Sequence, residues 1–201
     1  MRRDLPSSTT AIRRAFADSI AAKRAFLREH AATLARVGEL MAERFAAGSK
    51  VLLFGNGGSA ADAQHIAAEF VNRFVIERPP LPAIALTTDS SALTSIANDY
   101  SYNDVFAKQV RALGRDGDVA IAISTSGTSP SVVRAVDACA KLGIHTVGLT
   151  GGDGGKLRGK VDFLLNVAAS RETARIQETH ILAGHVLCQI VDEKLYGGKR
   201  R

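Results

Sequence analysis

Long hydrophobic runs, paired cysteines and tryptophan are all absent from this 201-residue sequence. The two cysteines, Cys139 and Cys188, are isolated, each lies in a helical pattern, and no Cys-x-x-Cys pair occurs. This argues against a cysteine metal site or a disulfide framework and predicts buried, reduced thiols. A hydrophobic content of 46% with 23% charged residues is typical of a globular protein and argues against disorder.

No stretch of about 18 apolar residues exists, and the amino terminus has no signal-peptide core. We therefore expect a cytoplasmic protein with no membrane partner. The net charge of +6 suits an anionic ligand, and nucleic acid is the alternative. Because no basic run is interleaved with aromatic residues, and much of the excess charge lies at the two ends of the chain, nucleic-acid binding is disfavoured.

After residue 46, short apolar runs alternate with helical patterns, which predicts a parallel sheet with helices on both faces. The continuous apolar run at 50–54 is typical of a strand buried on both sides. We expect four more strands, at 82–86, 118–123, 145–149 and 161–165. We expect helices at 59–75, 90–97, 103–113, 130–142 and 174–195.

The segment from residue 8 to about 46 keeps helical spacing of its apolar residues and is rich in alanine. The pattern predicts two helices that meet near His30. Because this segment has no strand partner, we divide the chain into a helical extension for oligomerisation (1–46), an α/β domain (47–196) and a basic tail (197–201).

Two loops have the composition of phosphate-binding loops. Gly55-Asn-Gly-Gly-Ser59 follows an expected strand and opens an expected helix, where glycines allow close approach and free N–H groups attract anions. Its Gly-x-Gly-x-x-Ala pattern also fits a dinucleotide fingerprint, but the acidic residue expected about 20 residues later is missing. Ser124-Thr-Ser-Gly-Thr-Ser129 offers five hydroxyls before Pro130, and it lacks the Gly-Lys-Ser/Thr ending of a nucleotide P-loop. The alternative for the second loop is a polar turn with a serine cap.

Two expected helices carry side chains suited to proton transfer or metal binding. His65 and Glu69 are four residues apart and share a helix face, and Gln177 and His185 lie along one ridge of the last helix. A carboxylate and an imidazole suit acid–base chemistry on a phosphorylated small molecule. The alternatives are a surface glutamate, a helix-face histidine and a core histidine, respectively, for Glu69, His65 and His185. His30, His145 and His180 receive no catalytic role.

The two loops, together with Asn98-Asp99, Leu149-Thr-Gly and Arg175-Ile-Gln-Glu178, resemble the sugar-isomerase (SIS) domain family and, within it, the phosphoheptose isomerases. The resemblance runs from about residue 10 to 196. It implies a flavodoxin-like three-layer sandwich with a five-stranded parallel sheet and an N-terminal helical extension. It also implies a homotetramer with active sites at subunit interfaces, and interconversion of D-sedoheptulose 7-phosphate and D-glycero-D-manno-heptose 7-phosphate through a cis-enediol. The phosphorylated seven-carbon sugar would then feed heptose biosynthesis, as for lipopolysaccharide.

The resemblance also implies roles for individual residues. Glu69 resembles the catalytic base and His185 its acid/base partner. Zinc is implied as the cofactor, with His65, Glu69, Gln177 and His185 as ligands, and no nucleotide cofactor is expected. Substrate contacts are implied for Glu69 and for Asn56, Gly57, Gly58, Ser59, Asn98, Asp99, Ser124, Thr125, Ser126, Ser129 and Gln177.

A related protein, the DnaA-associating initiation factor, has the same domain and similar flanking sequence, but it binds a protein. It lacks the acid and the imidazole at the positions of Glu69 and His185, and this sequence has both. The enzyme is therefore the favoured interpretation. A non-catalytic adaptor for the replication initiator, or a module that senses a sugar phosphate without turnover, remains the alternative.

Overall fold

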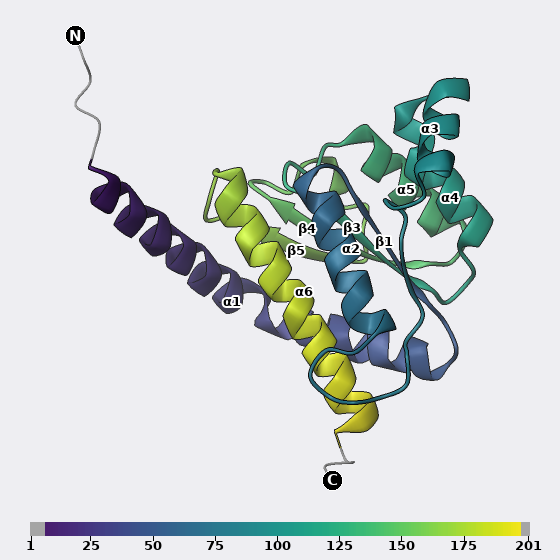
Figure 1. Cartoon of the computed structure of the whole chain (residues 1–201), viewed down its shortest axis with the longest axis horizontal. Helices are drawn as coiled ribbons and strands as arrows, with labels where there is room; N and C mark the ends of the chain where they lie inside the picture. The colour runs from purple at the N-terminus through teal and green to yellow at the C-terminus, as the bar shows by residue number, and fades with distance from the viewer. Residues whose placement is uncertain (1–6, 198–201) are drawn as a thin grey trace.

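The computed structural model describes residues 7–197, which form a five-stranded sheet covered by helices on both faces (Figure 1). The strands are β1 Val51–Gly55, β2 Ala83–Ala85, β3 Val119–Ser124, β4 His145–Gly151 and β5 Phe163–Val167. The helices are α1 Ser8–Ala46, α2 Gly58–Val71, α3 Ser90–Asp99, α4 Val105–Leu113, α5 Pro130–Lys141 and α6 Thr173–Tyr196, with 3-10 turns η1 Tyr102–Asp104 and η2 Gly155–Leu157. None of the helices within this range is both long and apolar enough to span a bilayer. Residues 198–201 of the expected basic tail lie outside the described residues.

All five strands are parallel, in the order β2-β1-β3-β4-β5, which confirms the predicted α/β fold. Every residue of β1 and of β3 is buried, because side chains from each strand enter a core on either face. Val119, Ile121 and Ile123 face α1, α2 and α6, whereas Ala120 and Ala122 face α4 and α5. The strand order reverses between β1 and β3, so the loops that follow these two strands flank a topological switch point, where open α/β sheets bind ligands.

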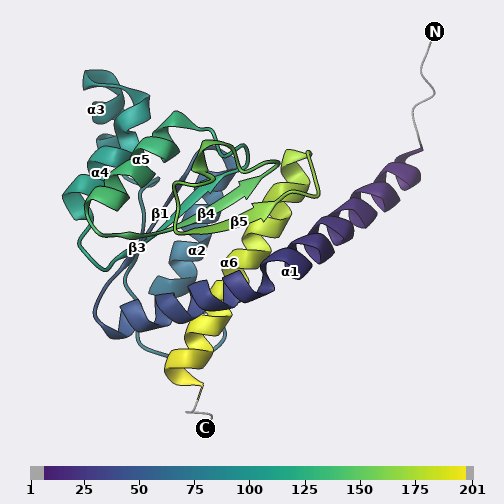
Figure 2. The same ribbon diagram turned by 180° about the vertical axis from the view of Figure 1, so that it is seen from behind.

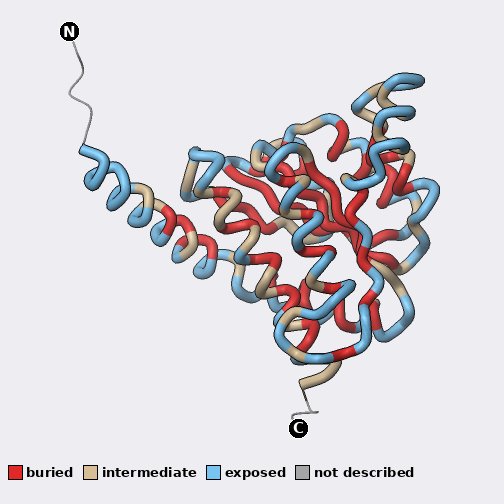
Figure 3. Tube along the Cα trace, viewed as in Figure 1, coloured by how far each residue is buried: buried red, intermediate tan, exposed pale blue. Residues whose placement is uncertain are grey.

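The N-terminal segment is one continuous helix, α1, so the prediction of two helices meeting near His30 was wrong. No proline interrupts the segment, and His30 is accommodated in the helix because its ring contacts the sheet: its Nε2 lies 2.9 Å from the Asn166 carbonyl oxygen of β5. The second half of α1 packs on the sheet beside α6, and its first half extends beyond the domain (Figures 1 and 2). The colouring by burial shows this extension to be mostly exposed (Figure 3).

Helix α2 ends at Val71, four residues earlier than the pattern predicted. The Arg78 side chain folds back on this end and donates hydrogen bonds to the carbonyl oxygens of Glu69 (2.8 Å) and Phe70 (2.6 Å). Because a helix leaves its last carbonyls without partners, a guanidinium at that point stabilises the termination. Residues 72–82 then form an irregular loop that leads to β2.

A buried polar network links α6 to β4 and, through Thr150, to β5. His180 is fully buried and its Nε2 lies 2.9 Å from the Thr150 carbonyl oxygen of β4. The Thr150 hydroxyl donates to the Asn166 side-chain oxygen of β5 at 2.8 Å. Burial lowers the pKa of His180 to about 4, and the hydrogen bond to Thr150 opposes this only in part, so the ring is neutral near pH 7. His180 is therefore a structural residue.

Candidate active site

Helices α2 and α6 lie side by side and run in the same direction (Figure 1). The contacts at two glycines establish this alignment. The Cα of Gly58, at the start of α2, approaches the Gln177 side chain of α6, and the Cα of Gly184 on α6 approaches the Ile66 side chain of α2. A Cβ atom at either glycine would overlap the facing side chain, so both positions allow close helix packing.

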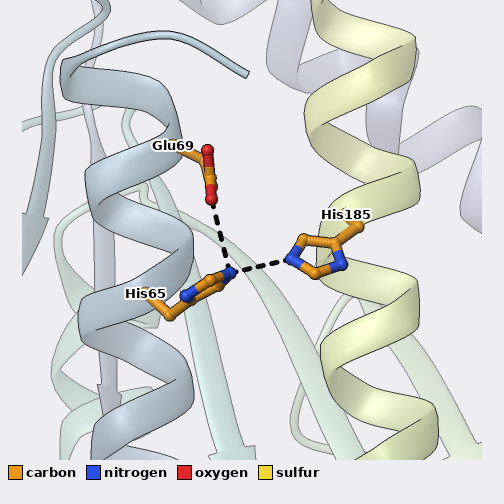
Figure 4. A group of neighbouring side chains, drawn as sticks. All are labelled: His65, Glu69 and His185. Atoms are coloured by element: carbon orange, nitrogen blue, oxygen red, sulfur yellow. Dashed lines mark hydrogen bonds and ion pairs between the residues drawn. The ribbon is translucent and has the colours of Figure 1, made fainter. Parts of the chain in front are cut away.

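His65, Glu69 and His185 meet between these helices (Figure 4). The Nε2 of His65 lies 2.8 Å from the Nε2 of His185 and 3.4 Å from a carboxylate oxygen of Glu69. The His65 side chain is 49% exposed and that of Glu69 is 24% exposed, so the group opens to solvent. The sequence predicted that His65 and Glu69 share a face, and the fold brings His185 to them from 120 residues away.

The possible ligand atoms of the three side chains lie close together, as they do in a metal site. One ligand atom from each residue lies within 4.8 Å of the other two. Ligands of a tetrahedral zinc ion lie about 3.3 Å apart. The 3.4 Å between His65 and Glu69 matches this spacing. The 2.8 Å between the two imidazole nitrogens is shorter, so the rings would have to move apart slightly. The donor set therefore fits a divalent cation such as zinc.

Asp62 is a further acid on this face of α2 that the sequence pattern did not single out. It lies one turn before His65 and two turns before Glu69 on α2. One of its carboxylate oxygens is buried and has no hydrogen-bond partner within residues 7–197. Burial raises the pKa of the Asp62 carboxyl, and the nearby His65 opposes the shift. The spacing of three and seven residues was the signal that could have identified it.

The two predicted phosphate loops lie together at the carboxyl ends of β1 and β3. The Asn56 side chain connects the first loop to α5 and η1: its amide donates to the Ser131 hydroxyl of α5 at 3.0 Å, and its oxygen accepts from the Tyr102 hydroxyl of η1 at 2.9 Å. Gly57 has a φ of 56°, a conformation that glycine adopts without strain. Helices α2 and α5 both begin without a side-chain cap, so their N-terminal ends are available to an anion.

In the second loop, the Ser124 hydroxyl donates to the Ser129 hydroxyl at 3.1 Å, and Ser126 accepts from the Thr128 backbone amide at 3.2 Å. Thr125 and Ser126 line an open pocket of about 610 Å³. The rest of its lining comes from the end of β4 and the loops that follow β4 and β5, namely Gly151, Gly152, Asp153, Ala168 and Arg171, and from the start of α6. A basic side chain and hydroxyl groups therefore face the same space.

The phosphate loops lie apart from the histidine cluster, and so do three other predicted site residues. Asn98 and Asp99 are at the exposed end of α3, where the Asn98 amide donates to the Asp99 carboxylate at 2.9 Å. Gln177 packs on Gly58 at the first turn of α2, and eight residues separate it from His185. This separation is about 12 Å along the helix axis. Gln177 therefore lies near the phosphate loops, and its role as a metal ligand stays a prediction.

The chain is similar to known proteins along most of its length. A family described as the SIS domain matches residues 15–151. A protein of Thermodesulfovibrio yellowstonii named phosphoheptose isomerase is 52% identical over 92% of this chain and 92% of its own length. A structure of phosphoheptose isomerase from Neisseria gonorrhoeae is 47% identical, covers 92% of this chain and 98% of its own, and has a TM-score of 0.87. Another from Francisella tularensis is 40% identical, covers 94% and 100%, and has a TM-score of 0.90.

Proposed function

Since the chain belongs to the SIS domain family and aligns over nearly its whole length with phosphoheptose isomerases, we propose that it interconverts D-sedoheptulose 7-phosphate and D-glycero-D-manno-heptose 7-phosphate. The protein is an isomerase that transfers hydrogen within one molecule. At the site, one observation supports this function most directly: Glu69 of α2 and His185 of α6 lie close together, beside His65. The adaptor that binds the replication initiator lacks both proton-transfer groups, so their convergence favours the enzyme.

Glu69 is the base in this proposal. A ketose becomes an aldose when a proton leaves C1 and a proton is delivered to C2, with a cis-enediol between the two steps. A carboxylate that is three-quarters buried and has an imidazole beside it is suited to accept and return this proton. His185 is suited to move a proton between the C1 and C2 oxygens, because an imidazole can act as both acid and base near neutral pH.

The second loop, residues 124–129, holds the phosphate in this proposal. Ser124, Ser126 and Ser129 offer hydroxyl donors, and the N-terminal ends of α2 and α5 contribute favourable dipoles. Binding of the phosphate at one end of the sugar restricts the position of the reacting carbons at the other end, which raises the rate of the chemical step.

The separation of loop and base supports an active site shared between subunits. Eleven residues of α2 separate Gly58 from Glu69, which is about 16 Å along the helix axis. This distance is greater than expected for an extended seven-carbon sugar phosphate, which favours a site built from the loops of one subunit and the base of another. We propose a homotetramer in which α1 contributes to the contacts, because its first half exposes Ile12, Phe16 and Ile20. We also propose, from the family resemblance, that the enzyme acts in the cytoplasm and supplies heptose biosynthesis.

Zinc is proposed as the bound metal, held by His65, Glu69 and His185. A zinc ion at this point would polarise the carbonyl oxygen of the sugar. In this proposal, the protein's own residues orient the sugar and move the protons.

Incubation of the purified protein with sedoheptulose 7-phosphate, with and without zinc, tests the proposal. We expect formation of the aldose, and a loss of about 100-fold or more in kcat for Glu69→Gln and for His185→Gln. Glu43→Gln, on the exposed surface of α1, is the matched control and is expected to retain activity. Absence of turnover in the folded wild-type protein would contradict the isomerase, and binding of the replication initiator in its place would favour the adaptor.

A further inference from the structure

The loop between α2 and β2, residues 72–82, contacts both helices that carry the acid–base residues. Its central contact is a buried ion pair: Arg78 Nε donates to a carboxylate oxygen of Asp192 on α6 at 2.8 Å. The Arg78 side chain is 0% exposed and that of Asp192 is 2% exposed. The loop therefore places a positive charge in the interior, between the last turn of α2 and the second half of α6.

The remaining Arg78 donors bind the end of α2. The two terminal nitrogens donate to the carbonyl oxygens of Glu69 and Phe70, and more weakly to those of Asn72 and Pro79. Glu69 is the proposed base, so its own backbone oxygen is one of the atoms held. A planar guanidinium has five N–H donors in fixed directions and can make these bonds at once, whereas an ammonium group has three donors at a single nitrogen.

Asp192 connects the same guanidinium to the other catalytic helix. It lies seven residues after His185 on α6, which is about two turns, so both side chains lie on one side of the helix. The loop makes a second contact there: the Phe74 ring stacks on the His185 ring with centroids 5.5 Å apart and planes at 23°. One loop thus contacts the backbone of the proposed base and the ring of its proposed partner.

Stability alone does not account for this ion pair. Well-packed apolar side chains often replace a buried ion pair with no loss of stability. The second carboxylate oxygen of Asp192 is buried and has no hydrogen-bond partner within residues 7–197, so the pairing is incomplete. The arrangement instead joins two helices whose separation determines whether Glu69 and His185 meet.

We propose that Arg78, paired with Asp192, is a positioning residue for isomerisation: it holds the end of α2 against α6 so that Glu69 and His185 act on one substrate. Phe74 assists by orienting the His185 ring. This inference rests on the proposed isomerase function. Arg78 itself does not touch the reacting atoms, and its effect is exerted through Glu69.

The test uses the double variant Arg78→Met/Asp192→Leu in the full-length protein. Removing both charges together leaves no unpaired buried ion, so the protein is expected to fold. Lys50→Met is the matched control, because it breaks another largely buried ion pair, with Nζ 2.6 Å from Asp118, between the residues that precede β1 and β3 and away from α6. Arg78→Lys is the second variant: it retains the positive charge and loses the planar set of guanidinium donors. It replaces the double variant, with the same criteria, if the double variant does not fold.

We expect the folded double variant to lose roughly tenfold or more in kcat, with little change in KM, because misplacement by about 1 Å costs up to about 100-fold. Exchange of the C1 hydrogen of the ketose with deuterated solvent is expected to slow in parallel. Lys50→Met is expected to lower the melting temperature and leave kcat unchanged. A kcat for the folded double variant equal to that of wild type, or an equal loss of kcat in the control, would overturn the inference.

A crystal structure of the double variant supplies a readout that does not depend on turnover. Displacement of Glu69 relative to His185 supports the positioning role, and an unchanged separation contradicts it. If the wild type converts the substrate and the double variant has the same kcat, the positioning role of Arg78 is refuted and the isomerase function is not. Absence of turnover in wild type refutes the proposed function, and the crystal structure then still decides whether Arg78 sets the geometry.

Discussion

The Nε2 atoms of His65 and His185 lie 2.8 Å apart, although one residue belongs to α2 and the other to α6. Two imidazoles can share such a contact only if one ring donates its N–H and the other accepts. A carboxylate oxygen of Glu69 also approaches the same nitrogen of His65, at 3.4 Å. One N–H cannot point to both neighbours, whereas a cation at the centre satisfies all three groups.

Zinc is therefore expected to stabilise the wild-type protein. A ligand present at about 100 times its Kd contributes about 2.7 kcal/mol to folding stability. The measurement is the melting temperature of metal-free protein with and without added zinc. His65→Asn should abolish the increase, whereas His145→Gln, at the start of β4, should retain it. Equal increases in wild type and His65→Asn would contradict this metal site.

Gly58→Ala is expected to weaken substrate binding more than folding. The new methyl group meets the amide of Gln177, which is the far end of a flexible side chain and can move away. Displacement of that amide disturbs the start of α2, where the phosphate is proposed to bind, so KM should rise by roughly tenfold with a small change in melting temperature. Gly48→Ala provides the comparison: nothing lies within 4 Å of a Cβ at that site, but its φ of 82° strains an alanine, so this variant should lower the melting temperature and leave KM unchanged. The prediction fails if both variants have the wild-type KM.

Acid is expected to destabilise the fold through His180. Its pKa is lowered to about 4 in the folded protein from 6.5, so between these values the unfolded chain binds the extra proton. The contribution to stability is present above pH 6.5 and is lost as the pH falls towards 4, by about 3 kcal/mol in total. Urea unfolding of wild type and His180→Gln from pH 4 to pH 7 measures this. The variant should show the smaller loss of stability on acidification, and parallel curves would refute the assignment.

Phe16→Glu is expected to weaken subunit association. The Phe16 side chain is 69% exposed on the extended half of α1, and Ile12 and Ile20 continue the same apolar stripe one turn away on either side. A buried carboxylate in an interface is costly, so the variant should shift to smaller species in light scattering after size-exclusion chromatography. Arg14→Glu places the same charge on roughly the opposite side of the helix and should keep the wild-type assembly. A tetramer in both variants would refute the proposed role of this stripe.

The elements that the sequence predicted well are those with a local cause. A continuous apolar run identifies β1 because a strand buried on both faces tolerates no polar residue. His65 and Glu69 share a face because helical geometry requires it. The termination of α2 was mispredicted because Arg78 determines it from outside the helix. The approach of His185 to His65 likewise depends on the packing of Gly184 against Ile66, a contact between residues 118 positions apart that no local pattern contains.

Helix α1 also gives the molecule a mechanical property. It spans 39 residues, about 58 Å, and contains neither glycine nor proline from Ser8 to Val37. A helix of this composition has no built-in hinge. We therefore expect α1 to be stiff, with an exposed outer half that is suited to contact a neighbouring subunit in the proposed homotetramer. The contact of His30 with Asn166 on β5 anchors its inner half to the sheet. In the proposed homotetramer, we expect a rotation of one subunit against another to reach β5, whose following loop borders the pocket lined by Thr125 and Ser126.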